Sequence, residues 1–165
     1  MKELLQKLNA CKDAIEWAGD KSWQEIYNTC HRGDWLLWLF KRTNPDDLQL
    51  LTLAKGHCAN TVRHLMKDER SIKAVDAAIA FGEGKISRDE LDASASDAAA
   101  AAFAATDAAD AYAAYAASDA YAAAAAYAAA SFAAAAAYAA KKENQQLTAD
   151  ICRKYLPIEV WNITK

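Results

Sequence analysis

The sequence predicts an all-α protein, because three features of its composition favour helices and disfavour strands. The 165 residues include 42 alanines, and alanine has the highest intrinsic helix propensity. Glycine (5) and proline (2) are scarce, so few residues interrupt a helix. Valine occurs only three times, which leaves little of the β-branched sequence typical of strands. We expect a single-domain helical bundle with close-packed, alanine-rich central helices.

Charge and cysteine content narrow the class of protein and its partners. The 19 basic and 22 acidic residues give a net charge of −3, so no nucleic-acid partner and no anionic membrane surface is expected. The N-terminal residues have charges spaced through them and lack the apolar stretch of a secretory signal. Four scattered cysteines are too few for a disulfide framework. These features predict a cytoplasmic protein with reduced thiols.

Short helices are expected within residues 1–86, where the composition is mixed. Apolar residues at helical spacing predict a first helix from Leu4 to Trp17, stopped by Gly19. The capping box that begins at Ser22 predicts a second helix, ending near Gly33. Asp34 is a candidate cap for the apolar run 35–40, which we expect to be buried on every side.

Further start signals predict the remaining helices of the first half. Asn44-Pro45 combines a cap with proline at the first helical position and predicts a helix to about Met66. A fifth helix is expected over 71–81. Ser87 begins a second capping box, which predicts a long helix from Arg88 onward.

Residues 87–140 form the alanine-rich region, with 32 alanines among the 48 residues of 93–140. An unbroken helix of that length would extend about 72 Å, which exceeds the size of such a domain. We therefore expect a break, preferably at Ser118-Asp119, and a core helix over 120–140. That last stretch is uncharged, but alanine and tyrosine contribute too little transfer energy to favour a membrane span.

The C-terminal region, 141–165, is predicted to form a docking helix and a tail. The helix should span 141–155. It should pack on the bundle through Leu147, Ile151 and Leu156.

The alanine-rich region also carries the acidic charge of the protein, with a net charge of −6 over residues 87–140. Aspartates and tyrosines interleave there on neighbouring helix faces, a combination suited to binding a basic protein. The candidate protein-binding residues are Asp107, Asp110, Tyr112, Tyr115 and Asp119. The alternative interpretation is that these aspartates are solvated residues that keep an alanine-rich helix soluble.

Catalytic and metal sites have weak support in the sequence. His57 and His64 lie one heptad apart on the predicted fourth helix, with Cys58 beside them, but that separation is too long for one zinc ion. Cys30-His31 has no visible third partner for nucleophilic catalysis, and no phosphate-binding glycine motif is present. We expect no enzyme activity, no metal site and no cofactor.

Trp35 and Trp38 are one helical turn apart and admit two interpretations. Packed with Trp17 and Trp23, they belong to the core; exposed together with Phe40, they would form a large apolar surface. The core interpretation is preferred.

Several segments together resemble a known family. They are Cys11-x-x-Ala14-x-x-Trp17, the block Cys30-His-Arg-Gly-Asp-Trp-Leu-Leu-Trp-Leu39, the tyrosine-studded alanine-rich region, and Ala149-Asp-Ile-Cys-Arg-Lys-Tyr-Leu-Pro157. The chain resembles immunity proteins with the Imm-five-like domain, which occur in bacterial toxin–immunity loci and in phages. The resemblance implies a small helical protein that binds and neutralises a cognate toxin without catalysis, and it brings no functional residues with it.

The expected function is therefore inhibition of a cognate, basic protein toxin by occlusion. Two other functions remain open. One is a phage or mobile-element accessory protein that self-associates as a homodimer through its alanine faces. The other is a small helical hydrolase that uses His57 or the aspartates.

Overall fold

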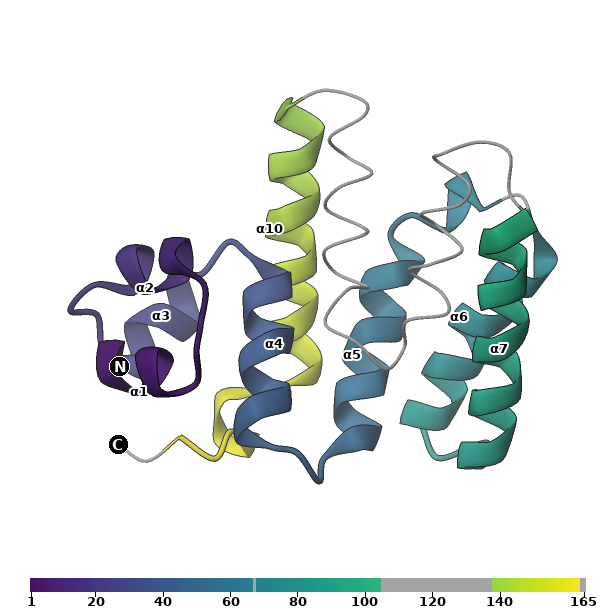
Figure 1. Cartoon of the computed structure of the whole chain (residues 1–165), viewed down its shortest axis with the longest axis horizontal. Coiled ribbons are helices and arrows are strands. Elements are labelled where there is room, and N and C mark those ends of the chain that lie inside the picture. The colour runs from purple at the N-terminus through teal and green to yellow at the C-terminus, as the bar shows by residue number, and fades with distance from the viewer. Residues whose placement is uncertain (67, 105–137, 164–165) are drawn as a thin grey trace.

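The computed structural model describes residues 1–66, 68–104 and 138–163, and these ranges form helices without any strand. The all-α prediction is confirmed (Figure 1). The elements are α1 (Lys2–Lys7), α2 (Lys12–Ala18), α3 (Trp23–Thr29), α4 (Gly33–Thr43), α5 (Leu48–Asn60), the 3-10 turn η1 (Arg63–Leu65), α6 (Glu69–Gly82), α7 (Arg88–Ala104), α10 (Tyr138–Tyr155) and the 3-10 turn η2 (Ile158–Val160).

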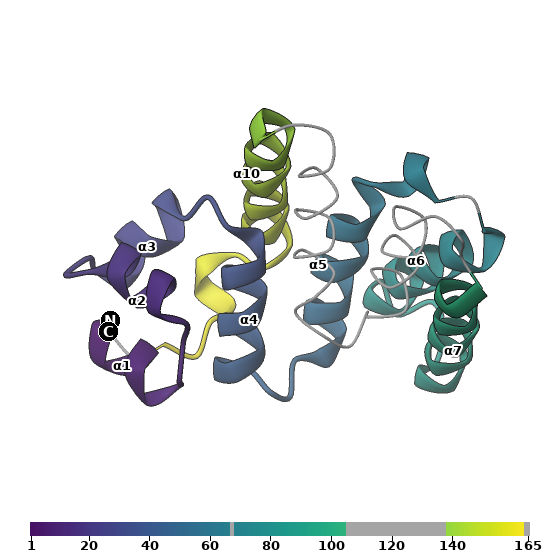
Figure 2. The ribbon, with the colours of Figure 1, turned by 45° about the horizontal axis from the view of Figure 1, so that its top comes forward.

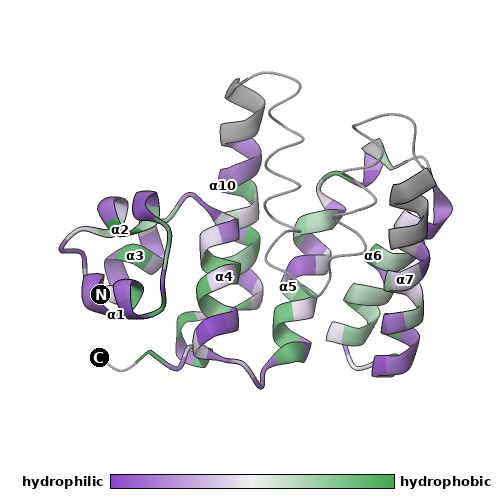
Figure 3. Ribbon diagram, in the orientation of Figure 1, coloured by the Kyte–Doolittle hydropathy of each residue, from purple (hydrophilic) through white to green (hydrophobic). Residues whose placement is uncertain are grey.

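The helices lie side by side in a row, which also includes α10 from the C-terminal part of the chain. The short helices α1, α2 and α3 gather at one end, beside α4, while α6 and α7 lie at the opposite end beyond α5 (Figures 1 and 2). α10 packs against both α4 and α5, so it closes the centre of the row. Hydrophilic residues predominate on α1 and α2, and hydrophobic residues run along α4 and α5 (Figure 3).

The predicted close packing between helices is present, and glycines lie at two of the contacts. A methyl group on Gly33 of α4 would lie 2.6 Å from the backbone carbon of Thr148 on α10. One on Gly56 of α5 would lie 2.9 Å from Cγ1 of Ile79 on α6. Because both distances are far below van der Waals contact, only glycine permits these two helix crossings.

Both predicted capping boxes are present. Ser22 Oγ accepts from the backbone N–H of Glu25, whose carboxylate accepts from the N–H of Ser22 at 2.8 Å. Ser87 and Glu90 repeat the arrangement at the start of α7. These reciprocal bonds satisfy N–H groups that a helix start otherwise leaves unpaired.

The predicted first helix is wrong in one respect, because it is two helices. Asn9 adopts a left-handed conformation with φ of 58° and ends α1. The N–H of Ala10 then bonds to the carbonyl of Leu5, and that of Asn9 to the carbonyl of Gln6. This pattern is a Schellman motif, in which asparagine can replace glycine.

The second and fourth predicted helices correspond to α3 and α5, and both are shorter than expected. The C-terminal region binds at the end of α3 and at Asn44, before the start of α5. α3 ends at Thr29, where Arg153 donates to the carbonyls of Tyr27 and Cys30. Asn44 is the C-cap residue of α4 and does not cap the start of α5; its side chain binds the tail, and α5 begins only at Leu48 and ends at Asn60.

The core centres on α4, and the C-terminal residues complete it. Leu36, Leu37 and Phe40 are at most 1% exposed, and Trp161 packs on Phe40 with ring centroids 4.9 Å apart. Of the docking residues predicted for α10, Leu156 is fully buried and Ile151 is half-buried. The prediction for Leu147 is wrong. This residue is 48% exposed, because α10 turns small and polar residues toward α4 and α5. Those inner residues are Gln145, Thr148, Ala149 and Cys152.

The centre of the alanine-rich region lies outside the described residues. α7 reaches Ala104 and α10 begins at Tyr138, so the predicted helix is found at both ends of the segment. The predicted break at Ser118-Asp119 and most of the core helix predicted over 120–140 fall between them. Within the described ranges, none of the helices has the length and apolarity that a membrane crossing would need.

Candidate functional site

An open apolar pocket of about 410 Å³ lies between the three N-terminal helices and α4. Its size falls within the range of ligand-binding cavities. Tryptophans from α2 and α4 form much of its wall, so we call it the tryptophan pocket. The residues that define it here are Ala14, Trp17, Arg32, Asp34, Trp35 and Trp38.

Helical spacing on α4 divides that helix between the core and the pocket. Trp35 and Trp38 are one turn apart and half-buried, and both line the pocket, while Leu37 and Phe40 are fully buried on the other side. The expectation that residues 35–40 are buried on every side is therefore wrong for one face. Trp23 lies elsewhere and packs on Trp161 at 4.8 Å.

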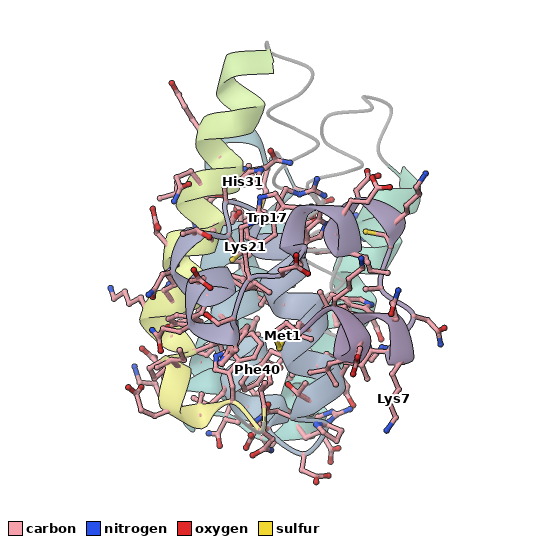
Figure 4. All side chains as sticks on the ribbon, turned by 90° about the vertical axis from the view of Figure 1, so that its left-hand side faces the viewer. Met1, Lys7, Trp17, Lys21, His31 and Phe40 are labelled. Atoms are coloured by element: carbon pink, nitrogen blue, oxygen red, sulfur yellow. The ribbon has the colours of Figure 1, made fainter. Side chains whose placement is uncertain are left out.

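Three aromatic rings join α2 to the start of α4. The Trp17 ring is 5.8 Å from that of Trp35 and 6.0 Å from that of His31, and His31 is 6.3 Å from Trp35. Contacts at these distances are favourable beyond the apolar area that they bury. Figure 4 shows Trp17 and His31 together at the end of the molecule that the first three helices form. The cluster holds one wall of the pocket in place.

The charged side chains among the described lining residues form one ion pair. Arg32 Nε donates to Asp34 Oδ1 at 2.8 Å and Nη2 donates to Oδ2 at 2.5 Å. The side chains are 24% and 10% exposed, and the hydrogen bond to Asp34 raises the pKa of Arg32. Asp34 thus pairs with Arg32 and provides no side-chain cap for α4, contrary to the prediction.

Two thiols line the pocket and differ in accessibility. Cys11 is exposed, whereas Cys30 is 1% exposed and its Sγ donates to the carbonyl of Arg32. Burial raises the pKa of Cys30 to about 11, so it is a neutral thiol near pH 7. This environment is the opposite of the one that activates a nucleophilic cysteine.

The histidines singled out in the sequence do not form a site together. His57 lies on α5 and stacks on Tyr155 at 4.0 Å, while His64 lies in η1, so the two do not share one helix as predicted. Cys58 is buried and its thiol points to the carbonyl of Thr148. In the part of the chain that the structure describes, no three metal-ligating side chains come together.

The candidate protein-binding residues from the sequence lie outside the described residues. They are Asp107, Asp110, Tyr112, Tyr115 and Asp119. The described part of the same acidic region, on α7, exposes Asp89, Glu90 and Asp97.

The pocket could not be predicted from the sequence, although one feature of its wall is visible in the sequence. The one-turn spacing of Trp35 and Trp38 was present, but it fits a core helix equally well. Comparison with protein-family models, with curated proteins and with solved structures gave no match for this chain.

Proposed function

We propose that this chain is an immunity protein that binds a cognate toxin and neutralises it by occlusion. The observation that carries the proposal is the open tryptophan pocket, which would receive an apolar side chain of the toxin. The resemblance to the Imm-five-like family adds the toxin as the class of partner.

The residue types in the pocket support protein binding. Tryptophan and arginine are the residues most enriched where single side chains dominate the affinity of an interface. Trp35 and Trp38 are presented by a regular helix, and Trp17 is held against Trp35 by ring contacts. A wall that is already in place loses little conformational entropy on binding.

Charge supports a second part of the same interface. The alanine-rich region has a net charge of −6 over residues 87–140, which favours a basic toxin and speeds its association. Within this proposal, Asp107 and Asp110 contribute carboxylates, and the pocket contributes the apolar anchor point.

The first test is the affinity of Trp38→Ala for the toxin encoded beside this gene, measured by calorimetry. A dominant interface tryptophan contributes about 2 kcal/mol or more, so the variant should bind roughly 30-fold more weakly. Leu147→Ala is the matched control, because it removes an exposed apolar side chain outside the pocket. Far-UV circular dichroism checks that both variants fold. Equal affinity of Trp38→Ala and the native chain would refute the role of the pocket.

The second test reverses charge at Asp107 and Asp110 together. Toxin binding should weaken more at low salt than at high salt, because screening shortens the range of surface charges. If affinity is unchanged at both salt concentrations, the acidic residues are not part of the interface.

A further inference from the structure

Each tryptophan of the pocket has a cationic side chain over its ring. Cations within about 6 Å of an indole face are attracted by its quadrupole. The three pairs are Lys21 with Trp17 at 4.7 Å, Arg32 with Trp35 at 4.7 Å, and Arg42 with Trp38 at 5.6 Å from the ring centroid. Figure 4 shows Lys21 beside Trp17, well away from Lys7. Arg32 thus belongs to the pocket lining, while Lys21 and Arg42 lie against rings that line the pocket.

Arg32 is both part of the pocket wall and fixed in orientation. Its Nε and Nη2 donate to the two oxygens of Asp34, and its guanidinium lies against the Trp35 ring. A guanidinium has five N–H donors, and this bidentate pair uses two of them. Nη1 takes part in no hydrogen bond with the described residues. Arg32 thus keeps donors for a second carboxylate, already oriented by the first.

The three cations differ in how far nearby acids compensate them: Arg32 is paired with Asp34, and Lys21 interacts electrostatically with Glu25 without forming an ion pair. Among the described residues that line the pocket, Asp34 is the one carboxylate, and it is paired with Arg32. Lys21 donates to the carbonyl of Trp17 at 2.5 Å, which keeps its ammonium near the ring. Glu16 on the same stretch of chain pairs with Lys12 at 3.6 Å. Neither Lys21 nor Arg42 forms an ion pair with any residue that the structure describes.

We propose that the tryptophan pocket binds small amphipathic carboxylic acids, with the apolar body against the tryptophans and the carboxylate on Nη1 of Arg32. Lys21 and Arg42 add attraction at the border. The inference concerns the pocket alone and holds whether or not the protein partner is a toxin. It disfavours cationic amphiphiles of the same chain length, because Lys21 and Arg42 would repel them while the Arg32 charge is balanced by Asp34.

The test compares three probes of equal chain length: decanoate, decanol and decyltrimethylammonium, all below their micelle-forming concentrations. Binding is followed by tryptophan fluorescence and by the rate at which N-ethylmaleimide modifies Cys11, the exposed cysteine of the pocket. A charge-assisted hydrogen bond predicts that decanoate binds roughly tenfold more tightly than decanol. Decyltrimethylammonium should bind most weakly, and saturating decanoate should slow the modification of Cys11.

Substitutions then show which cationic side chains bind the carboxylate of decanoate. Arg32→Lys keeps the charge but loses the planar fork, so decanoate affinity should fall toward that of decanol while decanol affinity stays unchanged. Arg42→Gln should weaken decanoate by a smaller factor, and Lys7→Gln, an exposed cation outside the pocket, should have no effect. Equal binding of decanoate and decanol, a signal that does not saturate, or an unprotected Cys11 would each overturn the proposal.

Discussion

Replacing Asn44 should destabilise the whole protein, because its side chain holds the C-terminal tail against α4. The amide nitrogen of Asn44 donates to the carbonyl of Val160 at 2.7 Å, and the amide oxygen accepts from the N–H of Asn162 at 3.1 Å. The side chain is 1% exposed, so water cannot replace these bonds easily. The tail that they hold carries Trp161 into the core, where its indole N–H donates to the carbonyl of Leu156.

The magnitude for Asn44→Ala follows from the two tail bonds. Each contributes about 1 kcal/mol, and a buried carbonyl left without a donor costs about 1–3 kcal/mol more. The expected loss is therefore about 3–5 kcal/mol in the free energy of unfolding, measured by urea titration. Asn162→Ala is the matched control, because it removes an exposed side chain and keeps the backbone N–H that Asn44 accepts. The free energy of unfolding of Asn162→Ala should fall by no more than about 0.5 kcal/mol.

A second substitution at the same position tests the direction of the hydrogen bonds. Asn44→Asp keeps an acceptor for Asn162 but turns a carboxylate toward the carbonyl of Val160 and the carboxylate of Asp47. Like charge and burial raise the pKa of such a carboxyl, so stability should be lowest near pH 7 and should recover as pH falls and the group becomes a donor. A loss below about 0.5 kcal/mol in Asn44→Ala, or no recovery in Asn44→Asp, would refute this reasoning.

Three further outcomes can be checked on the same protein. Gly33→Ala places a methyl group 2.6 Å from the α10 backbone and should lower the free energy of unfolding by about 1–3 kcal/mol in urea; an unchanged midpoint would contradict the close contact. N-ethylmaleimide at pH 8 should modify Cys11 and spare Cys30, because burial raises the pKa of Cys30 to about 11; equal rates by mass spectrometry would count against it. Hydrogen bonds from Arg70 lower the pKa of Asp68 to about 2, so the carboxylate stabilises the fold above its ordinary pKa of 3.8 and this stabilisation is lost as pH falls toward 2. The difference in unfolding free energy between the native chain and Asp68→Asn should shrink over that window, and a difference independent of pH would exclude the contribution.

The helices that could be predicted are those whose signals are local. Ser22 and Ser87 each begin a capping box that needs only three following residues, and both are present. The all-α class follows from alanine content and from the scarcity of glycine, proline and valine, which act on every segment independently. Such features depend on near neighbours in the chain, so tertiary contacts rarely reverse them.

The predictions that failed depended on partners far away in sequence. Asn44 is a good helix cap by its residue type, but the tail 116 residues later uses its amide. α3 was expected to reach Gly33, yet it ends at Thr29, where Arg153 donates to the carbonyls of Tyr27 and Cys30. Leu147 has the right type for docking, but the close approach of α4 requires small residues on the inner face of α10. The periodicity of the sequence does not show these helix ends and buried faces, because contacts between distant segments determine them.

The pocket was missed for a related reason. The spacing of Trp35 and Trp38 shows that they share a helix face, but not whether other helices cover that face completely. How far this face of α4 is covered depends on α1 and α2, which were predicted as one helix. The break at Asn9 sets the direction of α1 relative to α2, and the recess lies between these helices and α4.

An open apolar recess costs stability, and that cost distinguishes a binding site from a packing defect. Ala14 is buried in the pocket wall, so Ala14→Leu adds apolar volume where the pocket is empty of protein atoms. Filling such space commonly raises stability by about 0.5–2 kcal/mol. If the recess is a packing defect, Ala14→Leu gains stability and loses nothing. If it is a site, the same variant gains stability and loses affinity for decanoate and for the toxin, because the leucine side chain fills the space that the ligand would occupy. Natural proteins keep such binding sites at the expense of stability. Opposite signs in the two measurements on one variant would therefore identify the pocket as functional, whereas a stabilised protein with unchanged decanoate affinity would place the binding elsewhere.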